Sequence, residues 1–263
     1  PESWWTNTAR NWNSGLFSGA GSSPDYYVVH NYYTAYQTNA GATEILATAV
    51  TVTQTMMDYV KQQLSSAGIP VKPIVLDEWN ITSQGSMQQV SEVNGLHADI
   101  VLGEALKNKF GMTSRWDLAN DWSNGNDHGM FSQGGEPGVT KWTPRPAFYH
   151  MYFFQKMIGD RFITSTVTGN TSLHAYASSY SSGQVGVILV NTGASATAQI
   201  KFKNFNPGGR AYWYSLYGSD DNGDFSRKVI VNGNAPVQAA GGPANYADIK
   251  AFSAAVSSSP INI

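Results

Sequence analysis

Residues 73–80 form a short apolar run that ends on two carboxylates, a tryptophan and an amide, in the order Pro-Ile-Val-Leu-Asp-Glu-Trp-Asn. The stretch Ile74, Val75 and Leu76 has the composition of a strand buried on both faces, and such strands occur almost only in parallel sheets covered by helices. In an α/β barrel the residues that carry the chemistry stand at the carboxyl ends of the strands. The run therefore predicts an α/β fold with Glu78 at the position of a catalytic carboxylate.

Similar strand-and-helix patterns flank this run on both sides. The expected strands are 26–30, 73–78 and 112–118, and the expected helices are 43–64, 86–109 and 144–157. Gly111 is the expected C-cap of the middle helix, and a Gly-rich loop over 119–142 precedes the last one. The order of these elements predicts three consecutive β/α units.

The pattern changes beyond Asp160, where short alternating segments are separated by Asn-Gly, Gly-Gly and Asn-Pro turns. The expected strands there are 161–168, 172–180, 184–191, 197–203, 210–217, 227–232 and 248–256. Strands of this length and spacing are typical of an antiparallel β-sandwich. We therefore expect two domains, with residues 1–160 in the β/α part and residues 161–263 in the sandwich.

Three parallel strands do not close a barrel of this class, which takes eight. Either the sheet is open and of an unusual kind, or the preceding strands belong to a segment outside this sequence. The second interpretation is favoured. An N-terminal barrel segment, from the same precursor or from a separate chain, is thus an expected partner, and residues 1–160 are expected to be the C-terminal part of a (β/α)8 TIM barrel.

Charged residues make up only 13% of the chain, against about 25% in typical soluble domains. The net charge of −2 and the lack of a dense Lys or Arg run argue against nucleic acid as a partner. No apolar stretch reaches the ~18 residues of a membrane span. There are no cysteines for thiolate metal sites, and the Asp-rich stretch 220–224 lacks the ligand spacing of an EF-hand. We expect no cofactor and no metal.

Tryptophan is concentrated in the first part of the chain. The residues concerned are Trp4, Trp5, Trp12, Trp79, Trp116, Trp122 and Trp142, and only Trp213 lies beyond Asp160. Sugar rings present flat faces of C–H bonds that stack on aromatic side chains, so this distribution favours a glycan-binding cleft in the first domain. Trp116, at the end of the third strand, is the expected floor of that cleft. For Trp4, Trp5 and Trp142 simple core packing is the alternative.

With these features the sequence resembles the retaining glycoside hydrolases with a (β/α)8 barrel, known as clan A, and especially their arabinofuranosidase-like and xylosidase-like members. The residues that carry the resemblance are Asp77-Glu78-Trp79-Asn80 at a strand end, His30-Asn31-Tyr32 one unit earlier and Trp116 one unit later. The resemblance implies that Glu78 is the nucleophile at the end of the seventh barrel strand. Tyr32 is then a hydrogen-bond donor to Glu78.

The expected substrate-binding residues are His30, Tyr32, Trp79, Asn80, Trp116, Asn120 and Trp122. Asp77 is expected to face away from Glu78 as a structural anchor, because side chains alternate along a strand. The loop residues Asn120, Asp121, Asn126, Asp127 and His128 either read substrate hydroxyls or only shape the loop. His97 and His150, inside expected helices, are interpreted as structural.

The resemblance also implies a general acid/base, a glutamate at the end of the fourth strand, which this chain does not supply. Its other glutamates, namely Glu2, Glu44, Glu92, Glu104 and Glu136, fall in helices or loops. The leading hypothesis is a secreted or periplasmic retaining glycosidase that cleaves a neutral polysaccharide or oligosaccharide, with its acid/base on the missing segment. The alternatives are a non-catalytic carbohydrate-binding or assembly fragment and a transglycosylase.

Overall fold

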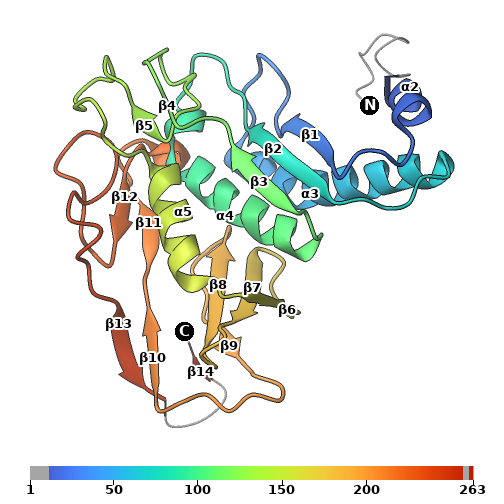
Figure 1. The fold of residues 1–263 in the computed structure, drawn as a ribbon. Coiled ribbons are helices and arrows are strands. Elements are labelled where there is room, and N and C mark those ends of the chain that lie inside the picture. The colour runs from blue at the N-terminus through green and yellow to red at the C-terminus, as the bar shows by residue number, and fades with distance from the viewer. Residues whose placement is uncertain (1–11, 257–260, 263) are drawn as a thin grey trace.

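The computed structural model describes residues 12–256 and 261–262, so Glu2, Trp4 and Trp5 lie outside the described residues. A parallel sheet of three strands forms the first part of the fold (Figure 1). Its strands are β1 (Tyr27–Tyr32), β2 (Ile74–Asn80) and β3 (Met112–Arg115), in that order across the sheet. Helix α2 (Trp12–Ala20) precedes the sheet, and α3 (Ala42–Ser66) and α4 (Glu92–Lys107) connect its strands. The three predicted strand-and-helix units are present.

The buried side chains explain these elements. In α3 they recur at helical spacing, from Ile45 and Leu46 through Met57 and Val60 to Leu64. In β2 the run Ile74–Leu76 is buried as predicted. Apolar side chains from α3, α4 and the sheet form one core cluster. Each helix is therefore held to the sheet by burial of its apolar face.

The middle helix is shorter than predicted. Residues 88–90 form a separate 3-10 turn, η1 (Gln88–Val90), and α4 begins at Glu92. At its end, Asn108 is the C-cap and Lys109 takes the left-handed conformation with φ of 64°. The prediction that Gly111 caps this helix is wrong, because Asn108 is the C-cap and Gly111 lies just before β3, where it donates its N–H to the carbonyl of Ile74 at 2.8 Å.

After β3 the chain forms a loop with two short parallel strands, β4 (Ala119–Asn120) and β5 (Phe131–Ser132), and then α5 (Pro146–Met157). His150 of α5 lies between Glu92 and Asp99 of α4, at 2.8 and 2.7 Å. Burial disfavours the charged imidazole, but the two carboxylates outweigh burial and raise the pKa of His150 to about 10. His97 is fully buried against the Tyr33 ring. His97 packs in the core and His150 joins α5 to α4 by ion pairs, so both have structural contacts, as the sequence suggests.

The rest of the chain consists of antiparallel pairs. A three-stranded sheet joins β6 (Arg161–Ile163), β7 (Leu173–Ser179) and β8 (Val185–Asn191). The remaining pairs are β9 (Gln199–Ile200) with β14 (Ile261–Asn262), β10 (Arg210–Trp213) with β13 (Phe252–Ala255), and β11 (Leu216–Gly218) with β12 (Val229–Val231); the short turn η2 (Gly223–Phe225) precedes β12. Every predicted β segment contains a strand, and the segment 210–217 is divided into two. The two-layer sandwich and the domain boundary at 160 stay predictions.

The two parts of the chain share their packing. Tyr176 and Val190, from β7 and β8, belong to the same core cluster as α4. Tyr149 and Phe153 of α5 pack with Val229, Val231 and Ile249. Helices α4 and α5 therefore lie between the parallel sheet and the antiparallel strands, as Figure 1 shows.

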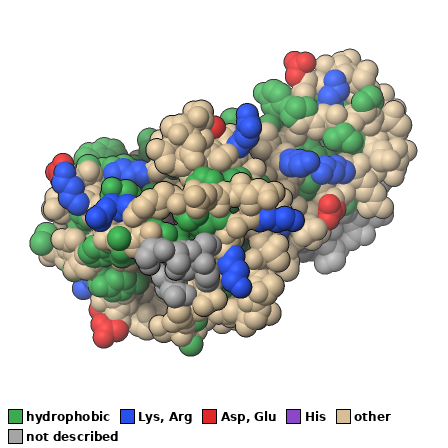
Figure 2. All heavy atoms as spheres, turned by 90° about the horizontal axis from the view of Figure 1, so that it is seen from below, with side chains coloured by type: hydrophobic (Ala, Val, Ile, Leu, Met, Phe, Trp, Pro, Cys, Tyr) green, Lys and Arg blue, Asp and Glu red, His purple; other side chains and the backbone are tan. Residues whose placement is uncertain are grey.

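The surface carries few charges. On the face shown in Figure 2, isolated Lys, Arg, Asp and Glu side chains stand among uncharged polar and hydrophobic ones. Among the described residues no helix has the length and apolar character to cross a membrane. In the Asp-rich turn, Asp221 is already bound by the Lys228 ammonium and the Ser226 hydroxyl, at 2.8 and 2.6 Å.

Gly103 offers a test of the contact between α4 and β7. A Cβ atom added at Gly103 would lie 2.3 Å from the ring of Tyr176. This tyrosine is 2% exposed, and its hydroxyl donates to the carboxylate of Glu104. We expect Gly103→Ala to lower the free energy of unfolding by ~1–3 kcal/mol through overpacking, although alanine favours helix. The control is Gly15→Ala in α2, where an added Cβ would meet no other described atom within 4 Å apart from its chain neighbours and its own helix backbone, and a gain of ~0.5–1 kcal/mol is expected. Urea denaturation measures both, and equal effects contradict the packing argument.

Candidate active site

Glu78 lies near the carboxyl end of β2, and residues of β1 contact its carboxylate. Tyr32 donates its hydroxyl to Oε1 at 2.8 Å, and Nδ1 of His30 lies 3.5 Å from Oε2. The Glu78 side chain is 25% exposed, so it is supported by the protein and open to a ligand. Burial and then Glu78 itself raise the pKa of Tyr32, so the phenol stays protonated and acts as a donor.

A β-bulge at this point changes the direction of Asp77. Leu76 is opposite Val29 but Glu78 is opposite His30, so β2 has one residue more than β1. A bulge of this kind interrupts the alternation of side chains. Oδ1 of Asp77 lies 2.8 Å from Nε2 of His30, and the same imidazole contacts Glu78. The prediction that Asp77 faces away from Glu78 is therefore wrong, since both carboxylates meet one ring.

Trp79 is placed in the core. It is 0% exposed, and its ring packs edge-on against Tyr33 with centroids 6.4 Å apart. A side chain in this position cannot stack on a sugar. The structure thus assigns Trp79 to packing in place of the predicted substrate contact.

Asn80 is also fully buried. Its Nδ2 donates to the carbonyls of Trp116 and His128, at 2.6 and 3.3 Å. Its Oδ1 accepts from the Ile81 N–H, Nδ2 of Asn94 and Nη2 of Arg115, at 2.8, 3.1 and 3.3 Å. Because these partners occupy both ends of the amide, Asn80 positions the neighbouring loop and is not open to a substrate.

Trp116 presents an exposed aromatic surface at the same edge of the sheet. Its N–H donates to the carbonyl of Trp79 at 3.0 Å and its carbonyl accepts from Asn80, while the residue is 47% exposed. Hydrogen bonds therefore fix the backbone of Trp116, while its indole ring is open to a ligand. The role of Trp116 as a platform for a sugar stays a prediction.

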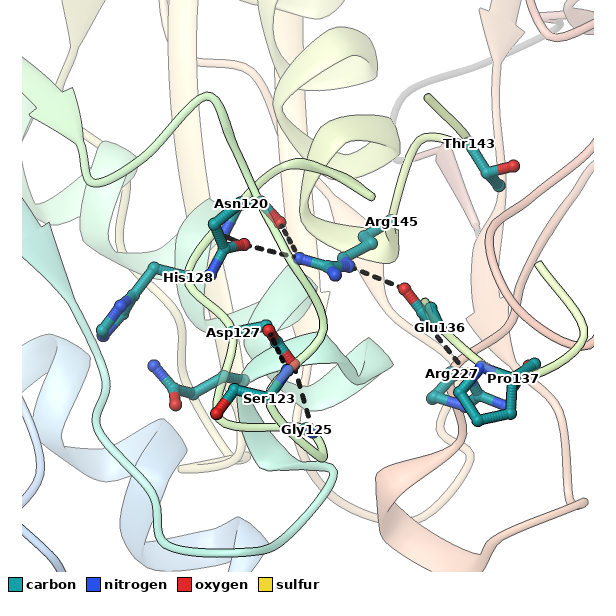
Figure 3. Close-up of polar contacts among 12 residues, drawn as sticks. Asn120, Ser123, Gly125, Asp127, His128, Glu136, Pro137, Thr143, Arg145 and Arg227 are labelled. Atoms are coloured by element: carbon teal, nitrogen blue, oxygen red, sulfur yellow. Dashed lines mark hydrogen bonds and ion pairs between the residues drawn. The ribbon is translucent and has the colours of Figure 1, made fainter. Parts of the chain in front are cut away.

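The loop after β3 is held by a buried network of charges, shown in Figure 3. The carboxylate of Glu136 is fully buried and accepts from Arg145 at 3.0 Å and from Arg227 at 2.8 Å. Arg145 also donates to Oδ1 of Asn120 at 2.9 Å, and Gly129 donates its N–H to the same oxygen at 2.8 Å. The amide oxygen of Asn120 therefore supports the loop, and its predicted role as a reader of hydroxyls gains no support.

Two other predicted loop residues are likewise engaged with the protein. Asp127 is buried and accepts from the N–H groups of Ser123 and Gly125, at 2.7 and 3.1 Å (Figure 3). The guanidinium of Arg227 lies 5.6 Å from the centre of the Trp122 ring. Trp122 thus faces the C-terminal part of the chain, and Asp127 shapes the loop.

His128 is the loop residue that reaches the Glu78 cluster. Its ring meets the Tyr32 ring edge-on, with centroids 5.4 Å apart. Burial and then the charge of Arg115 lower the pKa of His128 to about 4, against the opposing effect of Glu78. Its imidazole is thus neutral at neutral pH.

Sequence reasoning missed Arg115 and Asp117, which flank Trp116. Arg115 is 8% exposed, and burial lowers its pKa to about 10, so it stays charged at neutral pH. Burial raises the pKa of Asp117, against the effect of Arg115 and Arg145. The available signal was a charged residue on each side of Trp116, at the end of the strand. The site therefore combines a supported carboxylate, an open indole and several buried polar groups.

Neither a comparison with protein-family profiles nor one with curated proteins gives a match. Solved structures do match. An α-L-arabinofuranosidase from Thermotoga maritima in complex with arabinose superimposes with a TM-score of 0.64 and 15% identity, over 96% of this chain and 52% of that chain. A GH51 α-L-arabinofuranosidase from Thermotoga petrophila RKU-1 superimposes with a TM-score of 0.64 and 15% identity, over 96% of this chain and 53% of that chain. A bifunctional glucanase–xylanase from a metagenome library superimposes with a TM-score of 0.58 and 14% identity, over 95% of this chain and 43% of that chain. At this identity the likeness shows the fold, and the chain spans about half the length of these proteins.

Two histidine rings test the electrostatics of the site and of its support. We expect the imidazole of His128 to titrate near pH 4 and that of His150 near pH 10. Nitrogen-detected NMR from about pH 3 to about pH 11 measures the titration of both rings. Titration of both near the ordinary histidine value contradicts the assigned burial and pairing.

The same rings predict opposite effects of pH on stability. An unfolded histidine has a pKa of about 6.5, whereas folded His128 has a pKa of about 4. Between about pH 4 and 6.5, His128 is therefore protonated in the unfolded chain and neutral in the folded one. The contribution of His128 to stability is present above that window and is lost as pH falls. The contribution of His150 is complete below about pH 6.5 and is lost as pH rises through about 10. The midpoint of urea denaturation, measured as a function of pH, tests both directions of the pH dependence.

Proposed function

We propose that this chain is the C-terminal part of a retaining glycoside hydrolase that cleaves a neutral polysaccharide or oligosaccharide, with Glu78 as the nucleophile. The observation that carries the proposal is the Glu78 carboxylate itself, partly exposed at a strand end and bound by the Tyr32 hydroxyl at 2.8 Å. The exposed indole of Trp116 at the same edge supports it. The matched structures are glycosidases by their names.

The parallel sheet supports the proposal that further β/α units complete a barrel. Val28, Val75 and Met112 are opposite one another across the three strands. Val28 and Met112 are 44% and 51% exposed, and Val75 stands outside the core cluster formed with α3 and α4. A parallel sheet normally has both faces covered. We infer that strands supplied by a preceding segment cover this face and pair with β1 and β3.

The mechanism that fits Glu78 is double displacement. A carboxylate oxygen of Glu78 forms a bond to the anomeric carbon while the glycosidic C–O bond breaks and the leaving oxygen takes a proton from a general acid. Water, deprotonated by the same group, then displaces Glu78. Tyr32 donates its hydroxyl to Oε1 of Glu78, which orients the carboxylate.

The general acid is assigned to the segment outside this chain, because the other described glutamates are occupied or distant in the chain. Glu44 is exposed in α3. Glu92 is paired with His150, and Glu104 with Lys107 and Tyr176. Glu136 is enclosed by Arg145 and Arg227. A retaining enzyme needs its second carboxyl about 5 Å from the nucleophile, and the missing β/α units are where we place it.

Two alternatives rest on specific observations. No other described glutamate contacts Glu78, Tyr32 or His30, which favours a non-catalytic carbohydrate-binding fragment. Transglycosylation uses the same covalent intermediate and differs only in the acceptor. We propose a secreted or periplasmic location, where the enzyme would meet polysaccharides from outside the cell. Calorimetry with glycans and a parallel assay for released sugar separate binding from turnover.

Substitution of Glu78 tests the nucleophile. In the full-length protein that contains this chain, we expect Glu78→Gln and Glu78→Ala to lower kcat by at least about 10³-fold, because the amide and methyl groups cannot form the glycosyl intermediate. The control is Glu44→Gln, an exposed carboxylate of α3, with unchanged rates. Near-normal turnover of both Glu78 variants overturns the assignment, and glycan binding without turnover by the parent supports the binding alternative.

A further inference from the structure

Polar atoms without partners gather around Glu78. Buried polar groups in proteins are nearly always hydrogen-bonded, so each exception needs an explanation. Nε2 of His128, Oδ1 of Asp117 and Nε of Arg115 are all buried and have no hydrogen-bond partner among the described residues. An unpaired buried polar atom costs about 1–3 kcal/mol. A ligand with several hydroxyl groups can supply the missing partners.

Hydrogen bonds hold the backbone on both sides of His128. Its carbonyl accepts from Nη1 of Arg115 at 2.7 Å and from Nδ2 of Asn80 at 3.3 Å. The next residue, Gly129, is bound through its N–H to Asn120, and the preceding Asp127 binds two backbone N–H groups of the loop. In Figure 3 the His128 ring points away from the network around Arg145. The loop is fixed on both sides of His128, and the imidazole projects from it.

The ring projects toward the phenol that supports Glu78. The Tyr32 ring is 5.4 Å from the His128 ring, and its hydroxyl is 2.8 Å from Oε1 of Glu78. The backbone carbonyl of Asp117 accepts from the N–H of Met130 at 3.0 Å, two residues beyond His128, so Asp117 lies beside the loop that carries this ring. Neutral imidazole has one donor and one acceptor nitrogen, and a hydroxyl group can satisfy either.

We propose that His128 is a substrate-binding residue, whose Nε2 forms a hydrogen bond with a hydroxyl of the sugar held at Glu78, while Oδ1 of Asp117 accepts from a second hydroxyl. The inference rests on the proposed function and deepens it, because it assigns contacts that select a polyhydroxylated neutral ring. Trp116, which lies between Arg115 and Asp117 in the chain, supplies the apolar face for the same ring.

The test uses the full-length protein with Glu78→Gln in every sample, so that ligands are bound without turnover. His128→Phe keeps a ring against Tyr32 and removes both nitrogens, and His128→Gln restores a polar group near the position of Nε2. His174→Phe is the matched control, since His174 is a half-buried histidine of β7. The probes are arabinotriose, xylotriose and cellotriose, each titrated by calorimetry.

For the probe that the parent binds, we expect His128→Phe to weaken binding at least about 10-fold, or about 1.4 kcal/mol, and His128→Gln to stay within about 3-fold, since a replaced hydrogen bond is worth only about 0.5–1.5 kcal/mol. His174→Phe should change nothing. Binding by His128→Phe as tight as that of the parent overturns the inference and leaves the proposed function standing. If the parent binds none of the probes, both fail.

A second measurement avoids dependence on variant folding. In the Glu78→Gln parent, saturation with the bound probe should shift the Nε2 resonance of His128 and leave that of His174 in place. An unmoved His128 resonance in a glycan-saturated sample contradicts the proposed contact.

Discussion

The buried amide of Asn80 joins the strand that carries Glu78 to the loop that carries the rest of the candidate site. Its Nδ2 binds the carbonyls of Trp116 and His128, and its Oδ1 binds the guanidinium of Arg115. Removal of one partner leaves a buried polar group unpaired, at a cost of about 1–3 kcal/mol. Since Asn80 is two residues beyond Glu78 on β2, one side chain fixes how the indole and the imidazole stand relative to the carboxylate.

The C-terminal part of the chain supports the same loop through charge. The buried carboxylate of Glu136 binds Arg145, at the start of α5, and Arg227, just before β12. Removal of one partner from a buried ion pair leaves an uncompensated charge and is strongly destabilising, whereas the pair itself is weak evidence for stability. Its more evident consequence is geometric, because Arg145 also binds Asn120 and the carbonyl of Gly129, next to His128. The C-terminal part of the chain therefore helps to hold the loop that carries His128.

Local patterns predicted the elements, and the resemblance to a glycosidase family implied the pairing of Tyr32 with Glu78. They did not predict which side chains turn inward. Trp79 and Asn80 were expected at the surface with Glu78, and the β-bulge at Asp77 alters the facing of the whole segment. A bulge depends on the register of neighbouring strands, which a single strand does not encode. Long-range networks such as that of Glu136 and Arg227, 91 residues apart, are likewise invisible to spacing rules.

Trapping a covalent bond between Glu78 and the sugar tests the proposed nucleophile most directly. The full-length protein is incubated with activated 2-deoxy-2-fluoro glycosides of arabinofuranose, xylose and glucose, which slow the hydrolysis of a glycosyl intermediate. Peptide mapping by mass spectrometry should then place the fluoroglycosyl group on Glu78. A label on Asp77, Asp117 or any other carboxylate, or turnover of the natural glycan with no label on Glu78, contradicts the account.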